Sequence, residues 1–125
     1  MNPLCTFIVS SHNRPVELRL TLACLQLQTE RNWEAIITDN SDSNLASLSE
    51  REVLRFPDLR IRYEYTGGRA ANPYRSAEIG AALATGTWLA FPSEDGYFCP
   101  WYLERMLKKA DAENLDLVYC DTVIG

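Results

Sequence analysis

Short apolar runs and longer amphipathic stretches alternate along this chain. The short runs are rich in β-branched and aromatic residues, which is typical of strands buried in a sheet. One of them, residues 59–65, alternates apolar with charged side chains and predicts a strand with one solvated face at a sheet edge. The five predicted strands are residues 4–10, 33–38, 59–65, 87–91 and 115–120.

The stretches between these runs carry helical periodicity and helix end signals. Apolar side chains cover more than one face of the first stretch, so we expect that helix to be largely buried. The third carries small residues at helical spacing, which would let it approach a sheet closely. Expected end signals are an Asn13 cap, a Ser47/Glu50 capping box and a Gly86 C-cap. The predicted helices are residues 13–28, 45–56, 73–84 and a fourth from residue 100.

Strict alternation of strands and helices predicts an α/β protein with three layers, α/β/α. Its sheet should be mostly parallel and Rossmann-like, with helices on both faces. A chain of 125 residues is long enough for one domain with a real core. The chain stops about five residues after the last predicted strand. We therefore expect residues 1–125 to be one domain that is truncated at its C-terminal end.

Composition and charge restrict the class of protein. The net charge of −5 argues against a nucleic-acid partner, because phosphate binding needs an excess of Lys and Arg. No apolar run approaches the roughly 20 residues of a membrane span, and the N-terminus lacks the basic start of a signal peptide. The four cysteines form no C-x-x-C pair, so we expect them to be reduced and buried and the protein to be cytoplasmic.

Polar residues gather where three of the predicted strands end. These loops are residues 10–14, 39–44 and 93–96. Since ligands of open α/β sheets bind outside the carboxyl ends of the strands, one crevice could collect all three loops. In the third loop, Glu94 and Asp95 could hold Mg²⁺ or Mn²⁺ against a diphosphate. The alternative is a solvated acidic turn.

Other candidate residues, in these loops or near the third predicted helix, have two interpretations each. Asp39 could accept a hydrogen bond from a uracil imide or a ribose hydroxyl, or it could be a turn-forming aspartate that bonds its own backbone. Arg69 and Arg75 could meet a diphosphate, or be solvated surface residues. For His12 a positioning or surface role is favoured over a general base. The glycine motifs of dinucleotide and P-loop sites are absent from the sequence.

Together these segments resemble the nucleotide-binding half of family 2 glycosyltransferases, which have the GT-A fold. Phe-Ile-Val-Ser-Ser-His-Asn-Arg-Pro is similar to the family's first strand and loop, and Trp-Glu-Ala-Ile-Ile-Thr-Asp-Asn-Ser is similar to its W-E-I-I-V-V-D-D-G segment. Trp-Leu-Ala-Phe-Pro-Ser-Glu-Asp resembles the block that holds the D-x-D motif. The matching segments are residues 7–15, 25–29, 32–41, 80–86, 88–95 and 100–103.

The resemblance implies an enzyme that transfers a sugar from a nucleotide-diphosphate sugar, such as a UDP-sugar, to a hydroxyl of a glycan or lipid. It implies an inverting, metal-assisted reaction with Mn²⁺ or Mg²⁺, and Asp95 as the metal-side carboxylate. The residues expected to hold the donor are Ser11, His12, Asn13, Arg14, Asp39, Ser41, Arg75, Ser93 and Glu94.

The sequence departs from the family pattern in ways that leave other functions open. Ser93 stands where the first D of D-x-D is expected, although Glu94 beside it could substitute. The family's A-R-N-x-G reads Ser-Ala-Glu-Ile-Gly here, and the half that normally supplies the catalytic base is absent, so no base is assigned. The alternatives are a catalytically decayed binding or regulatory module, and a different Rossmann-like nucleotide-binding domain.

Overall fold

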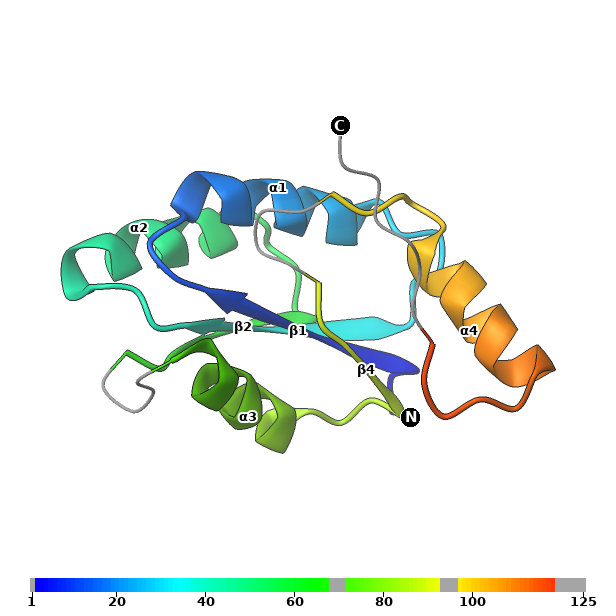
Figure 1. Ribbon diagram of the computed structural model, residues 1–125. Helices are drawn as coiled ribbons and strands as arrows, with labels where there is room; N and C mark the ends of the chain where they lie inside the picture. Colours follow the sequence, from blue (N-terminus) through cyan, green and yellow to red (C-terminus); the bar gives the residue numbers. More distant parts are fainter. Residues whose placement is uncertain (1, 68–71, 93–96, 119–125) are drawn as a thin grey trace.

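The computed structural model describes residues 2–67, 72–92 and 97–118, in which strands and helices alternate as the sequence predicts (Figure 1). The strands and helices begin and end close to the predicted positions. They are β1 (Cys5–Ser11), α1 (Pro15–Gln26), β2 (Trp33–Asp39), α2 (Ser43–Leu54), β3 (Ile61–Tyr65), α3 (Pro73–Leu83), β4 (Trp88–Ala90) and α4 (Tyr102–Ala112).

The described strands form one parallel sheet in the order β3-β2-β1-β4. The predicted edge position of β3 is therefore confirmed. The chain adds β2 and β3 on one side of β1 and then crosses to add β4 on the other side. The carboxyl ends of β1 and β4 thus flank a topological switch point, where open α/β sheets bind their ligands.

Helices cover both faces of the sheet, as Figure 1 shows: α1 and α2 lie over one face and α3 over the other. The close approach expected of α3 is confirmed at Gly80. A Cβ atom there would lie 2.9 Å from methyl groups of both Ile8 and Thr38. The helix can reach the sheet because that side chain is missing.

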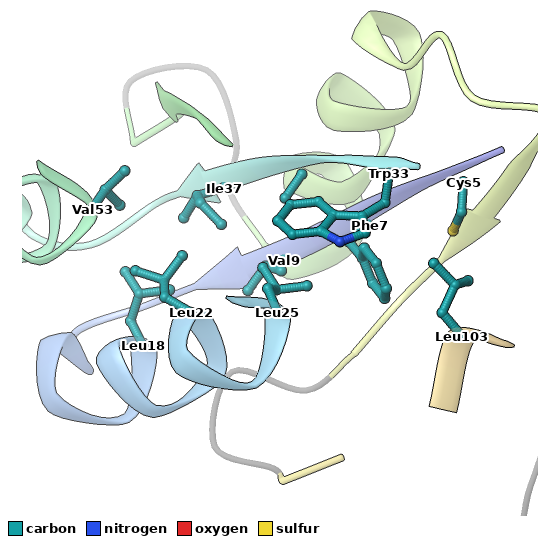
Figure 2. Close-up of a cluster of buried hydrophobic side chains, with 11 residues drawn as sticks. Cys5, Phe7, Val9, Leu18, Leu22, Leu25, Trp33, Ile37, Val53 and Leu103 are labelled. Carbon is teal, nitrogen blue, oxygen red and sulfur yellow. The ribbon is translucent and has the colours of Figure 1, made fainter. Parts of the chain in front are cut away.

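The main core lies between the sheet and α1. Alternate side chains of β1 and β2 point to this face, and Phe7 meets Trp33 edge to face with ring centroids 5.9 Å apart. Figure 2 shows how three leucines of α1 pack onto them. Each fully buried leucine stabilises the fold by about 2 kcal/mol. The leucines are Leu18, Leu22 and Leu25.

A second apolar region lies beside β4. There a hollow of about 410 Å³ separates β4 from α4 and is lined mainly by apolar side chains, among them Trp88, Phe91, Met106 and Leu117. Phe91 is 61% exposed and Leu117 is 78% exposed. Within the described part of the chain, β4 has a neighbouring strand on one side only.

Three predicted helix ends are wrong. Helix α1 is capped at Arg14, and Asn13 lies outside the helix in a left-handed conformation with φ 55°. Helix α2 begins two residues early, at Ser43, so Ser47 and Glu50 lie inside it and form no capping box. Gly86 does not take a positive φ and is no C-cap. A Cβ atom there would lie 2.6 Å from the Thr6 backbone nitrogen, so the glycine serves close packing instead.

Two further expectations need correction. Helix α1 is not largely buried, because Val16 and Leu20 on its outer face are 57% and 40% exposed. Leu27, just after its last residue, is 64% exposed. The described part of the fifth predicted strand, residues 115–118, is not extended into a strand. Residues 119 and 120, the rest of that prediction, lie outside the described residues.

Candidate functional site

Two of the three predicted loops lie together at the carboxyl edge of the sheet. Ser11 and Asp39 are register partners at the ends of β1 and β2. The backbone N–H of Asn40 donates to the Ser11 carbonyl at 3.0 Å, and that of Thr66 donates to the Asp39 carbonyl. The ends of β1, β2 and β3 are therefore held in one surface.

Asp39 is completely buried beneath this surface. Its Oδ1 accepts from the backbone N–H of Ser41 at 3.0 Å and also from the Ser41 hydroxyl. Its Oδ2 accepts from the hydroxyl of Tyr63 at 2.6 Å. The bond to the backbone two residues on is an Asx turn, so the turn-forming interpretation of Asp39 describes this structure.

Ser41 and Asn13 join the loop after β1, the first loop, to the loop after β2, the second loop. The Ser41 hydroxyl oxygen accepts from the backbone N–H of Asn13 at 2.7 Å. The Asn13 side chain bonds Asp42 in both directions, accepting from its backbone N–H at 2.9 Å and donating to its carboxylate at 3.2 Å. Asn13 thus bridges the loops, which explains why it leaves the cap position. Its left-handed backbone is one that Asn tolerates better than most residues.

His12 belongs to the same polar surface. Its Nδ1 lies 3.0 Å from the carbonyl oxygen of Asn40. Because a carbonyl oxygen only accepts, the proton is assigned to Nδ1, which leaves Nε2 as an acceptor 3.4 Å from the Asn13 amide nitrogen. In this arrangement His12 holds the first loop against the second.

Tyr63 and Tyr65 are contributors that the sequence reasoning missed. Tyr63 bonds the Asp39 carboxylate, and Tyr65 donates to the Ser41 carbonyl oxygen at 3.0 Å. Burial and the Asp39 carboxylate both raise the pKa of Tyr63. A signal was present in the sequence, because the alternation of residues 59–65 puts Tyr63 and Tyr65 on the same face of that strand.

The amino end of α3 lies at this edge as well. The hydroxyls of Thr66 and Ser76, both buried, are 2.9 Å apart and tie the end of β3 to the first turn of α3. Asn72 caps the helix by accepting from the backbone N–H of Arg75. The Arg75 guanidinium forms an exposed ion pair with Glu78 at 2.8 Å.

Four predicted residues lie outside the described residues: Arg69, Ser93, Glu94 and Asp95. Their predicted roles are not tested by the structure. Within the described ranges no three His, Cys, Asp or Glu side chains gather as a metal site. Arg14 is exposed at the start of α1, and its carbonyl oxygen accepts from Leu18.

The described cysteines, Cys5, Cys24 and Cys99, are free thiols. Cys5 is buried as predicted, whereas Cys24 and Cys99 are only partly buried, so the prediction of burial is wrong for these two. Burial raises the pKa of the Cys5 thiol to about 12, so it stays protonated in the core at neutral pH. Over the part of the chain that the structure describes, no helix has both the length and the apolar character needed to cross a bilayer.

The chain belongs to the glycosyl transferase family 2. The model of this family matches residues 6–125, nearly the whole sequence. The resemblance drawn from its motifs is therefore confirmed, and so is the predicted fold class.

Relatives by sequence are themselves glycosyltransferases. An uncharacterized glycosyltransferase of Haemophilus influenzae is 32% identical over 117 residues, which cover 93% of this chain and 38% of that protein. The UDP-Glc:alpha-D-GlcNAc-diphosphoundecaprenol beta-1,3-glucosyltransferase WfgD of Escherichia coli is 25% identical over 93% of this chain and 44% of its own length. The chain thus spans less than half of these relatives.

Solved glycosyltransferases share its fold. The mannosyltransferase PcManGT of Pyrobaculum calidifontis, in complex with GDP-Man and Mn²⁺, matches 88% of this chain and 33% of its own with a TM-score of 0.76 and 18% identity. TarS of S. aureus in complex with UDP-GlcNAc matches 91% of this chain and 32% of its own with a TM-score of 0.72 and 18% identity.

Proposed function

We propose that this chain supplies the donor-binding half of a glycosyltransferase that uses a nucleotide-diphosphate sugar. The observation that carries the proposal is the polar surface at the carboxyl edge, where the loops after β1 and β2 are bonded to each other through Ser41 and Asn13. The loop after β1 borders the switch point between β1 and β4, where such folds bind nucleotides. Membership of the family supports the same conclusion.

The nucleoside would lie against the exposed groups of this surface. His12, Asn13 and Arg14 follow β1, and Ser41 and Asp39 support them from β2. Arg75 lies on the first turn of α3, whose amino end carries partial positive charge, so it suits the diphosphate.

The acidic segment, residues 93–96, comes shortly after β4 in the sequence. Asp95, with Glu94 and Ser93 beside it, would hold Mn²⁺ or Mg²⁺, because hard cations prefer oxygen ligands. When bound, the ion neutralises the charge of the diphosphate leaving group. The pairing of GDP-Man with Mn²⁺ in PcManGT supports this role.

The reaction proposed is an inverting transfer. The acceptor hydroxyl attacks the anomeric carbon from the face opposite the diphosphate, the new glycosidic bond forms, and the bond to the diphosphate breaks. The hydroxyl proton passes to a base that this chain does not identify. A UDP-sugar as donor, a glycan or lipid as acceptor and a cytoplasmic location stay predictions.

A second candidate is a decayed module that binds a ligand without catalysis. Two observations favour it: Ser93 replaces an expected carboxylate, and the Arg75 guanidinium is paired with Glu78. Such a module could still bind nucleotide, so binding and turnover have to be measured separately.

Calorimetry separates these cases. The chain is titrated with UDP and GDP, each with and without Mn²⁺. The proposal expects binding that requires the metal and that Asp95→Ala abolishes. Asp111→Ala, an exposed aspartate of α4, is the matched control and should bind like the original chain. Failure of the folded chain to bind either nucleotide at millimolar concentration would contradict the proposal.

A further inference from the structure

Gln28 is a polar side chain buried between the end of α1 and the start of α4. It follows the last residue of α1 by two positions and is only 1% exposed. Its amide nitrogen donates to the carbonyl oxygens of Cys24 at 3.1 Å and Cys99 at 2.9 Å. Its amide oxygen accepts from the backbone N–H of Leu103 at 3.0 Å. Both N–H groups of the amide are thus used, which fixes the side chain in one position.

The bond to Leu103 caps α4 from a distance. Leu103 is in the first turn of this helix, where backbone N–H groups have no partner within the helix. The N-cap residue, Trp101, makes no capping bond with its side chain, and Gln28 supplies an acceptor from 75 residues earlier in the chain. Leu103 is itself buried, so an N–H left there without an acceptor would be costly.

Thr29 strengthens the same junction. Its backbone N–H donates to the carbonyl oxygen of Pro100 at 2.8 Å, and its hydroxyl donates to the Glu104 carboxylate at 3.0 Å. Residues 28 and 29 therefore hold both the first turn of α4 and the residues just before it.

This junction lies just after the acidic segment, residues 93–96, along the chain. Before that segment, β4 is fixed because Ala90 is the register partner of Phe7 in β1. After it, the ring of Phe98 stacks on that of Phe7 with centroids 5.9 Å apart, and Gln28 holds the carbonyl of the next residue. The sheet thus anchors the chain before the acidic segment, and Gln28 anchors it after the segment.

We propose that Gln28 is a positioning residue of the donor site, an inference that rests on the proposed function. By holding the start of α4, its amide fixes the place at which the chain leaves the acidic segment. This favours the arrangement in which Asp95 binds the metal of the donor. Because Gln28 is buried, it contacts neither the metal nor the nucleotide itself.

A measurement without nucleotide tests the cap. Gln28→Met keeps a side chain of similar length but removes the three hydrogen bonds. We expect hydrogen exchange of the Leu103 amide, followed by NMR, to accelerate about tenfold or more relative to the Val9 amide in β1, since it loses its acceptor. Gln26→Met is the matched control, because that amide lies two residues away and donates to Asp58 instead.

A titration with Mn²⁺ tests the effect on donor binding. UDP binding is measured by calorimetry at increasing Mn²⁺, which gives the metal concentration at half-saturation. We expect this concentration to rise about fivefold in Gln28→Met and to stay unchanged in Gln26→Met. At saturating Mn²⁺ the affinity for UDP should return to that of the original chain, because excess metal selects the binding arrangement. A loss of folded protein alone would lower the number of binding sites without shifting the metal concentration.

The inference is overturned if Gln28→Met folds and keeps the original metal concentration, or if Gln26→Met shifts it equally. Should Gln28→Met not fold, Thr29→Ala takes its place, because it removes only the exposed bond to Glu104. A shift of about twofold is then expected, and no shift overturns the inference. If the original chain binds no UDP at any Mn²⁺ concentration, the proposed function fails instead, while Leu103 exchange still decides whether Gln28 caps α4.

Discussion

Strand β2 carries a carboxylate near each of its ends, and the two are used differently. Glu34 lies near the amino end and Asp39 at the carboxyl end, on opposite faces of the sheet. Each collects hydrogen bonds from segments distant in sequence. At the amino end these bonds hold β2 to β1 and to the segment before β4, whereas at the carboxyl end they shape a surface loop. Similar chemistry therefore serves stability at one end and a candidate site at the other.

Glu34 joins three segments of backbone. It accepts from the Thr6 hydroxyl at 2.5 Å and from the backbone N–H and hydroxyl of Thr85 at 2.7 and 2.9 Å. The Thr6 hydroxyl oxygen accepts in turn from the N–H of Gly86 at 2.9 Å. Burial alone would raise the pKa of Glu34, but the hydrogen bonds from Thr6, Thr85 and Gly86 together lower it.

The largest expected effect tests how tightly the amino end is packed. Gly86→Ala should destabilise the fold by about 3 kcal/mol, because its Cβ would meet backbone atoms of Cys5 and Thr6 that cannot move aside. Gly67→Ala, near the carboxyl end, is the matched control. The atoms nearest to its Cβ are outer ring atoms of Tyr65, and this ring can swing away at the cost of one hydrogen bond to Ser41. If the two variants lose the same free energy of unfolding in urea, the two ends of the sheet do not differ in how tightly they are packed.

Glu34→Ala separates stability from binding. We expect a loss of about 2 kcal/mol in urea unfolding, since the buried Thr6 hydroxyl and the Thr85 N–H lose their acceptor. Nucleotide affinity should not change, because the residue lies at the other end of the sheet. A clear fall in affinity would remove the distinction between the two ends.

The lowered pKa of Glu34 adds a pH dependence. Its folded pKa lies below the value of about 4.3 in an unfolded chain, so the stability it contributes is present above that pH. That stability is lost as the pH falls toward the folded pKa. Glu34→Gln should show a flatter decline of stability with acid than the original chain.

Tyr63→Phe probes the carboxyl end with a smaller effect. It removes the donor to Asp39 Oδ2 and should cost about 1 kcal/mol. The raised pKa of Tyr63 means that the folded chain keeps this proton above about pH 10, where unfolded tyrosines ionise. Its contribution to stability is therefore present below pH 10 and lost as the pH rises further. Phenolate absorbance should show a late-titrating tyrosine that disappears in the variant.

The smallest effect on stability is expected from Arg75→Ala. Its side chain is 58% exposed and its partner Glu78 is 67% exposed, so the ion pair contributes less than about 0.5 kcal/mol. If Arg75 meets the diphosphate, the variant weakens UDP binding, whereas Glu78→Ala strengthens it by releasing the guanidinium. Unchanged affinity in both variants would remove Arg75 from the donor site.

The sequence predicts the alternation of elements well because each apolar run must be buried. Trp33 to Ile37 is apolar enough to fix β2 whatever surrounds it, and Pro15 marks the start of α1 within one residue. Local end signals fail where a distant partner competes for the same side chain. Asn13 could cap α1, but Asp42, 29 residues away, offers it two hydrogen bonds instead.

In the candidate site, too, the sequence predicts the general arrangement but not the contacts between residues distant in the chain. That the loops after β1 and β2 meet could be predicted from parallel strands alone. The burial of Asp39 could not, because it depends on Tyr63, and on Ser41 turning its hydroxyl inward. Such contacts are set by strand register and side-chain rotamers, which a single sequence does not specify.

The open side of β4 has a consequence for the behaviour of the chain in solution. Among the described residues, one edge of β4 beside exposed Phe91 and Leu117 has no partner strand, and such an edge is a template for pairing with another molecule. The net charge of −5 keeps molecules apart at neutral pH. Near the isoelectric point, or at high ionic strength, that repulsion weakens and edge-to-edge association gains. Purified samples should therefore stay clearest at neutral pH and low salt.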